Sequence, residues 1–153
     1  MPQKLKLTIE LVPSTVWNQN LRAILPKIEW DALRKKVYGA YGNTCGICKA
    51  AGTLHAHEIW DYDDTKHIQS LKSLIALCAL CHHIKHIGFA GIASSKGGLD
   101  FEKLVHHFMK VNACDRQEFQ KHYSIAFETW EKRCHPDWDL DLGILKYYSL
   151  LIH

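Results

Sequence analysis

The sequence predicts an α+β protein of 153 residues that is organised around a small metal-stapled unit. Three observations predict this class. Polar and apolar residues alternate near the start of the chain, which is typical of a half-buried strand. Two Cys-x-x-Cys pairs, at positions 45–48 and 78–81, enclose a second alternating segment. Apolar residues then recur at helical spacing from position 101 onward.

The amino-terminal arm is predicted to contain one strand and one helix. In residues 4–12 the apolar positions of the alternation would form one buried face, consisting of Leu5, Leu7, Ile9 and Leu11. Pro13 ends this strand. Residues 26–41 have a helical pattern, whose apolar positions are Ile28, Leu33, Val37 and Tyr41.

A basic run occupies the other face of this predicted helix. Its members are Arg34, Lys35 and Lys36. They are candidates for contacts with a nucleic-acid backbone, because phosphates attract clustered cationic side chains. A charge run on a helix is more often only its solvated face, and the sequence leaves both interpretations open.

Four cysteines have the spacing of a closed zinc site, and they are Cys45, Cys48, Cys78 and Cys81. Two thiolates spaced by two residues can reach one ion from a single tight turn, and two such turns complete a tetrahedron. We therefore predict one structural Zn²⁺. A redox Cys-x-x-Cys would explain neither the doubling of the motif nor the histidines beside it.

Three histidines form a second layer around the cysteines. His82 and His86 share a face of the helix predicted for residues 79–87, and His57 lies on the first strand of the predicted hairpin. Three neutral imidazoles that meet at one point would hold a second divalent cation, with positions open for water or phosphate. Imidazole favours a transition metal such as Zn²⁺, Ni²⁺ or Mn²⁺, and Mg²⁺ stays open.

The remaining segments complete the predicted architecture. Leu71, Leu74 and Ile75 have helical spacing before an apolar run that suits the second strand of the hairpin. Gly88 is predicted to end the metal-binding helix, and residues 91–98 to form a loop. Two helices follow, one capped by Asp100 and one beginning after Asp115. Residues 137–146 alternate again and are predicted to add a strand beside the amino-terminal one.

The motifs between residues 45 and 86 together resemble the HNH endonucleases of the ββα-metal type, in the branch stapled by four zinc-binding cysteines. The runs that carry the resemblance are Cys-x-x-Cys, Leu-x-x-His-x-Ile and Leu-Cys-x-x-Cys-His-x-x-x-His. The His-Glu-Ile-Trp-Asp-Tyr-Asp-Asp run is similar to one in a group of little-characterised bacterial HNH-like proteins. The resemblance covers about a third of the chain and implies a zinc-stapled ββα core at 43–90. From the chain length and the flanking patterns we predict one domain, with an amino-terminal strand-helix arm at 1–42 and a helical extension at 99–153.

The activity that the resemblance implies is metal-dependent hydrolysis of phosphodiester bonds, with DNA as the expected substrate. His57, His82 and His86 match the positions that hold the catalytic cation in His-rich members. Glu58 stands where the family's general-base histidine is expected, and Ser73 where its asparagine is expected.

These two departures leave the roles of the remaining groups open. Glu58 is predicted to act with His57 at the catalytic centre, as base or as extra ligand; alternatively it orients a histidine while His55 or His67 is the base. The rival interpretation is a catalytically degenerate, zinc-stabilised module that binds nucleic acid or protein. RNA as substrate also stays open, and so does a homodimer that would cut both strands.

Net charge and hydropathy say less about function than the motifs do. The net charge of +3, from 19 Lys and Arg against 16 Asp and Glu, mildly favours a nucleic-acid partner. Lys85, on the metal-binding helix, joins the basic run as a candidate phosphate contact. No apolar run approaches the roughly 20 residues that cross a bilayer, and the first residues lack the apolar core of a signal peptide. We expect a cytoplasmic protein without a membrane segment.

Overall fold

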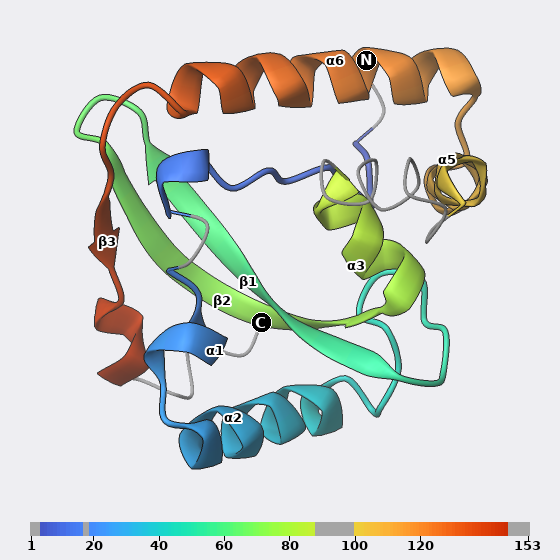
Figure 1. Ribbon diagram of the computed structural model, residues 1–153. Helices are drawn as coiled ribbons and strands as arrows, with labels where there is room; N and C mark the ends of the chain where they lie inside the picture. The colour runs from blue at the N-terminus through green and yellow to red at the C-terminus, as the bar shows by residue number, and fades with distance from the viewer. Residues whose placement is uncertain (1–3, 17–18, 88–99, 147–153) are drawn as a thin grey trace.

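The computed structural model describes residues 4–16, 19–87 and 100–146. In this part of the chain the fold is mixed α+β, with a three-stranded sheet of order β1-β2-β3 and helices on both sides of it (Figure 1). Strands β1 (Leu54–Asp63) and β2 (Ile68–Cys78) form an antiparallel hairpin, and the short β3 (Asp139–Asp141) runs parallel to β2. Because β2 lies in the centre, β1 is an edge strand.

Five α-helices and two short 3-10 turns accompany the sheet in the described residues. They are η1 (Ser14–Val16), α1 (Leu21–Ile24), α2 (Lys27–Ala40), α3 (Ala79–Lys85), α5 (Phe101–Asn112), α6 (Arg116–Arg133) and η2 (Gly143–Lys146). The predicted cap at Asp100 is confirmed, since its side chain accepts a hydrogen bond from the Lys103 N–H. Asp115 caps α6 in the same way. None of the described helices is long and apolar enough to cross a membrane.

The sheet separates two hydrophobic clusters. On one side α2 packs on β2 through Trp30, Leu33 and Val37. On the other side α3, α5, α6 and residues 4–12, called the arm from here on, enclose a larger cluster that includes Ile75 and Phe108. The arm (dark blue in Figure 1) thus runs on the same side of the sheet as α3.

The amino-terminal arm, residues 4–12, is extended but forms no strand in the described structure. Several of its backbone groups bond to side chains instead, and the Glu10 N–H donates to the Lys85 carbonyl. Asn112 binds the N–H groups of Lys6 and Leu7 and the Leu7 carbonyl, and His122 accepts from the Ile9 N–H. The predicted strand is therefore wrong, whereas its predicted apolar face packs into the core, with Leu7 and Ile9 buried.

Strand β2 begins earlier than the helical spacing of its apolar residues suggests. Leu71, Leu74 and Ile75 are spaced as on a helix, and the sequence leaves open where this pattern gives way to the second strand; in the structure all of Ile68–Cys78 is a strand. A bulge explains the spacing: Ile59 pairs with Ser73 and Trp60 with Leu71, so Lys72 is unopposed. This extra residue returns Leu71 to the face of Leu74, three positions later.

Two smaller differences concern α2 and β3, and one further prediction cannot be compared with the structure. Ile28, expected on the buried face of α2, is 85% exposed, and Trp30 is buried in its place. Strand β3 pairs with β2 and not with the arm. Gly88 and residues 91–98, for which a helix end and a loop were predicted, lie outside the described residues.

Candidate metal centres

The four cysteines of the two Cys-x-x-Cys motifs come together. One sulfur from each of Cys45, Cys48, Cys78 and Cys81 lies within 4.8 Å of all the others. The first pair sits in the turn before β1, and the second pair spans the junction of β2 with α3. Such a group could hold one structural metal ion such as zinc, as the spacing predicts.

Local backbone geometry explains how the first pair is presented. The Gly46 N–H donates to the Ala76 carbonyl at 2.8 Å, which joins the turn to β2. The Cys45 N–H and the Ala50 carbonyl close the turn on itself at 2.9 Å. Lys49 adopts a positive φ of 68°, a conformation typical of tight turns.

Contacts among the cysteines and with a nearby histidine affect the protonation of the sulfur cluster. A hydrogen bond from Cys81 lowers the pKa of Cys45, which favours the thiolate that zinc requires. His107, on α5, places its Nε2 atom 3.2 Å from the Cys81 sulfur. This contact connects α5 to the cysteine cluster.

The three predicted histidines also come together. One ring nitrogen from each of His57, His82 and His86 lies within 4.8 Å of the other two. The ring centroids of His57 and His82 are each 4.9 Å from that of His86. His57 comes from β1 and is 3% exposed, while α3 carries the other two one turn apart.

Burial and neighbouring charges favour the neutral, metal-binding form of His82 and His86. Burial, reinforced by the neighbouring imidazoles, lowers the pKa of His82 to about 2. Burial and His57 similarly lower the pKa of His86 to about 4. Both rings therefore carry a free lone pair at neutral pH.

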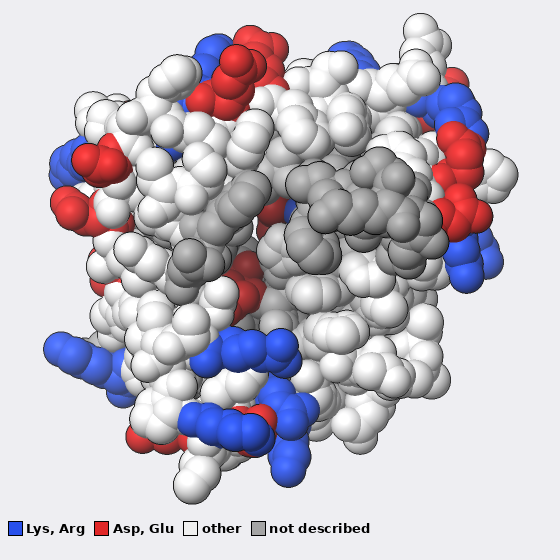
Figure 2. Space-filling model, in the orientation of Figure 1, with Lys and Arg blue, Asp and Glu red and all other residues white. Residues whose placement is uncertain are grey.

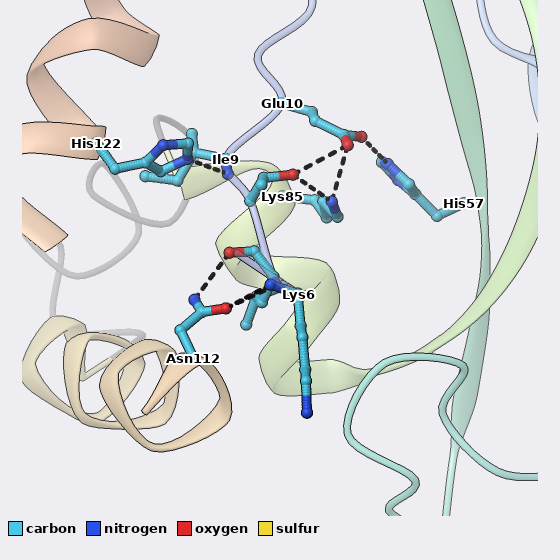
Figure 3. A network of polar contacts seen from close by, with 9 residues as sticks. Lys6, Ile9, Glu10, His57, Lys85, Asn112 and His122 are labelled. Carbon is cyan, nitrogen blue, oxygen red and sulfur yellow. Dashed lines mark hydrogen bonds and ion pairs between the residues drawn. The ribbon is translucent and has the colours of Figure 1, made fainter. Parts of the chain in front are cut away.

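A carboxylate that the sequence did not reveal completes this cluster. Glu10, on the arm, approaches the His57 Nε2 atom at 3.4 Å with one oxygen and bonds the Lys85 ammonium at 2.9 Å with the other (Figure 3). Burial, the largest effect, would raise the pKa of Glu10; the hydrogen bonds and charges of His57 and Lys85 together lower it to about 2. Glu10 is therefore ionised at neutral pH.

The second nitrogen of His57 fits a metal ligand. Its Nδ1 atom is buried and has no hydrogen-bond partner among the described residues. A buried imidazole nitrogen without a partner is costly unless something binds it. With Nε2 directed at Glu10, Nδ1 is the atom left for an ion.

Glu58 does not belong to this cluster. Alternation along β1 places it on the opposite face from His57, and its carboxylate accepts a hydrogen bond from the Leu21 N–H at 3.0 Å. Ser73, at the position of the expected asparagine, is buried, and its hydroxyl lacks a partner among the described residues. Of the alternative bases, His67 packs on Trp138.

His55 lies next to the histidine cluster. It shares the face of β1 that carries His57, and its ring stacks on that of His82 at a centroid distance of 4.9 Å. Burial, followed by the charges of His83 and Arg22, lowers the pKa of His55, so this imidazole is also neutral at pH 7.

The predicted nucleic-acid contacts divide into two groups. Lys85 is only 5% exposed, and its ammonium is bonded to Glu10 and Thr8, so it is not the surface contact that the sequence predicted. The basic run lies on α2, across the sheet from the histidines, and Arg34 pairs with Asp31 at 2.9 Å. Figure 2 shows lysine and arginine side chains gathered over α2.

A cavity of about 370 Å³ extends along the edge of the sheet from the histidine cluster. The arm, β1 and α6 enclose it, and Glu10, His57, Asp61, Trp130 and Arg133 are among its lining residues. The cavity gives the buried His57 region contact with a space of small-ligand size.

The comparisons with known proteins identify no relative: neither the family models nor the curated proteins nor the solved structures gave a significant match to this chain. The assignment of a function therefore depends on the geometry of the two clusters.

Sequence reasoning missed Glu10 and Thr8, although a signal was present. Both occupy polar positions of the alternating arm, on the opposite side from Leu7 and Ile9. Both bind the same Lys85 ammonium. The polar side of an alternating segment can thus face the interior of the protein, as it does here where Thr8 and Glu10 contact the buried Lys85.

Proposed function

We propose that the protein is a metal-dependent phosphodiester hydrolase of the HNH type that acts on nucleic acid, with DNA as the expected substrate. The observation that supports this most is the meeting of His57, from a β-hairpin, with His82 and His86, from the helix that follows it. The order β1-β2-α3 is the one that a ββα-metal core has, and the cysteine cluster holds the hairpin against the helix.

The chemistry follows from the properties of the three imidazoles. One nitrogen of each lies close to one of each of the others, and the pKa values of His82 and His86 are lowered far enough to keep these two rings neutral at working pH. The cluster therefore offers three ligands and leaves other coordination positions to water or phosphate. A divalent cation held there supplies stabilisation of the negative charge on the scissile phosphate and the leaving oxygen. The cavity beside His57 offers space for the substrate.

His55 is the candidate for activating the attacking water. It is neutral, it lies on the same face of β1 as His57, and its ring contacts His82. Glu58, which the resemblance to HNH endonucleases would assign to this role, instead accepts a hydrogen bond from the Leu21 N–H at the start of α1. General-base catalysis by an imidazole requires such a neutral ring near the reacting water.

The cation site is tested by metal content and cleavage together. The purified chain should bind two divalent ions, and it should cleave plasmid DNA in at least one of Mg²⁺, Mn²⁺, Ni²⁺ or Zn²⁺. His57→Gln should retain one ion, held by the cysteines, and lose cleavage. Equal cleavage by both proteins would contradict the proposal, and a parallel incubation with RNA decides the substrate class.

The role of His55 requires a separate variant. His55→Gln should still bind two ions but cleave about 10²- to 10⁴-fold more slowly, the usual contribution of a positioned base. Glu102→Gln, which changes an exposed carboxylate bonded to Arg116, is the matched control and should cleave as the wild type does. A loss of activity in Glu58→Gln with none in His55→Gln would reverse the assignment.

A second function has its own observations. Glu58 is committed to a structural hydrogen bond, and the hydroxyl of Ser73 lacks a partner among the described residues. Both features favour a zinc-stabilised binding module that does not hydrolyse its ligand. One ion per chain and no cleavage with any cation would favour this module over the hydrolase.

A further inference from the structure

The buried histidine of the cation cluster has a single polar partner in the described structure. The Nε2 atom of His57 lies 3.4 Å from a Glu10 oxygen, and its Nδ1 atom has none. A neutral imidazole has one N–H donor and one lone pair. Because an ionised carboxylate only accepts hydrogen bonds, His57 acting as a metal ligand would keep its proton on Nε2, toward Glu10, and offer its lone pair from Nδ1.

The carboxylate is held in place by several contacts of its own. Lys85 bonds its other oxygen at 2.9 Å, and the Thr8 hydroxyl contacts that same oxygen at 3.2 Å. The Glu10 N–H donates to the Lys85 carbonyl at 3.2 Å. Glu10 is therefore attached to α3 through both its backbone and its side chain, and Figure 3 shows the side-chain contacts.

The location of Lys85 makes this attachment specific to the cation cluster. Lys85 lies on α3 between His82 and His86, and it is 5% exposed. A buried ammonium requires a counter-charge, and Glu10 supplies it. One carboxylate thus contacts β1, through His57, and the helix that bears the other two imidazoles.

We propose that Glu10 is a positioning residue for the metal ligand His57. It fixes the tautomer and the orientation of the ring, so that Nδ1 is presented to the cation held with His82 and His86. The amino-terminal arm is then a functional part of the cation site. This inference rests on the proposed function, since it requires that the three histidines bind an ion.

A carboxylate behind a metal-binding histidine has a measurable effect. It raises the basicity of the imidazole and restrains its rotation, and the loss of such a partner commonly weakens metal binding 10- to 100-fold. A group that only neutralised Lys85 would not have this effect once the lysine charge was removed as well.

The test is a titration with Co²⁺ of protein whose cysteine cluster already holds zinc, followed through the visible absorption of bound Co²⁺. Glu10→Gln should bind Co²⁺ about 10- to 100-fold more weakly than the wild type, with an altered spectrum. Glu58→Gln, which changes a carboxylate on the other face of β1, should bind as the wild type does. Unchanged affinity in Glu10→Gln would overturn the proposal.

A double variant separates positioning from charge compensation. If Glu10 acts on His57, Lys85→Met should retain strong Co²⁺ binding, and Glu10→Gln combined with Lys85→Met should still bind weakly. If Glu10 only balances the lysine, the double variant should recover wild-type affinity. That recovery would reject the positioning role.

Nitrogen-15 NMR of the histidine rings supplies a readout that needs no variant to fold. With diamagnetic Zn²⁺ loaded at both clusters, His57 of the wild type should bind the ion through Nδ1 and keep its proton on Nε2, and ligation through Nε2 would overturn the inference. A wild type that binds no second ion would defeat the proposed function instead. Equal binding by the wild type and Glu10→Gln would defeat only the role of Glu10.

Discussion

At the scale of single residues, Gly46 shows how closely the first cysteine turn packs on the sheet. A Cβ atom at this position would lie 2.8 Å from Cε1 of Tyr41 and 2.9 Å from Cγ1 of Ile75. Neither neighbour is the free end of a flexible chain. The turn between Cys45 and Cys48 therefore depends on the absence of a side chain at its second position.

Gly46→Ala should lower the free energy of unfolding by about 1–3 kcal/mol, because an added methyl group overpacks a filled space. Gly39→Ala is the control. In α2 nothing lies within 4 Å of its Cβ position, so this change should be neutral or stabilise by about 0.5–1 kcal/mol. Urea denaturation of the zinc-loaded proteins measures both, and equal effects would contradict the packing argument.

The candidate ligands could be predicted from the sequence because their geometry is local. Two residues between cysteines fix a turn, and four positions between His82 and His86 fix one face of a helix. Glu10 was beyond such reasoning, since 47 positions separate it from His57 and no periodicity connects them. Glu58 was predicted at the catalytic centre because it follows His57 in the sequence. Strand alternation, however, places adjacent side chains on opposite faces, and Glu58 bonds to Leu21.

At the scale of elements, the arm shows that a segment with alternating polar and apolar residues can pack in an extended form without pairing with another β-strand. Its apolar residues pack as a strand's would, yet Asn112 replaces the partner strand. The side-chain oxygen accepts from the N–H groups of Lys6 and Leu7, and the amide donates to the Leu7 carbonyl at 2.9 Å. One buried amide thus satisfies three backbone groups of the arm.

Asn112→Ala should destabilise the protein by on the order of 3 kcal/mol, because each buried backbone group left unpaired costs about 1–3 kcal/mol. Asn20→Ala is the comparison, since Asn20 caps the exposed α1 and its loss should cost about 1 kcal/mol. Hydrogen exchange should accelerate at the amides of Lys6 and Leu7 in the first variant only. Similar costs for the two variants would refute this role of Asn112.

Strand β2 shows why its first half could not be assigned from spacing. Leu71 and Leu74 face the same cluster at an interval of three, which is normally helical. The bulge at Lys72 produces this interval in a strand, and a bulge has no simple signature in one sequence. The caps and apolar stripes of α5 and α6, by contrast, are local and were predicted.

At the scale of the whole molecule, the buried neutral histidines connect stability to pH. Burial lowers the pKa of His82 to about 2 and of His86 to about 4, whereas both titrate near 6.5 in the unfolded chain. Between about pH 6.5 and 4 the unfolded state therefore binds more protons than the folded state. Stability must rise with pH across this window and fall on acidification.

Without added divalent cation, the free energy of unfolding should decrease as the pH is lowered from 7 to 4. His86→Gln should show a shallower decrease, by on the order of 2 kcal/mol over this range. Thermal unfolding followed by circular dichroism at several pH values provides the comparison, and both proteins share the cysteine cluster. Parallel pH curves would mean that His86 is not buried in its neutral form.

Helices α5 and α6 contact both the amino-terminal arm and the cysteine cluster. His107 and Asn112 from α5 and His122 from α6 contact the cysteine cluster or the arm. The sequence predicts these helices but not these contacts, because they bridge segments up to 113 positions apart. The packing of the two metal clusters is therefore a property of the complete fold.

Cys81 and His82 are consecutive residues of α3, yet one belongs to the sulfur cluster and the other to the imidazole cluster. An insertion of a single residue between them would rotate everything downstream by about 100° about the axis of this seven-residue helix. The sulfurs would keep their arrangement while His82 and His86 turned away from His57. Both ion sites therefore depend on the same helical register of α3, and such an insertion would leave only the sulfur cluster intact.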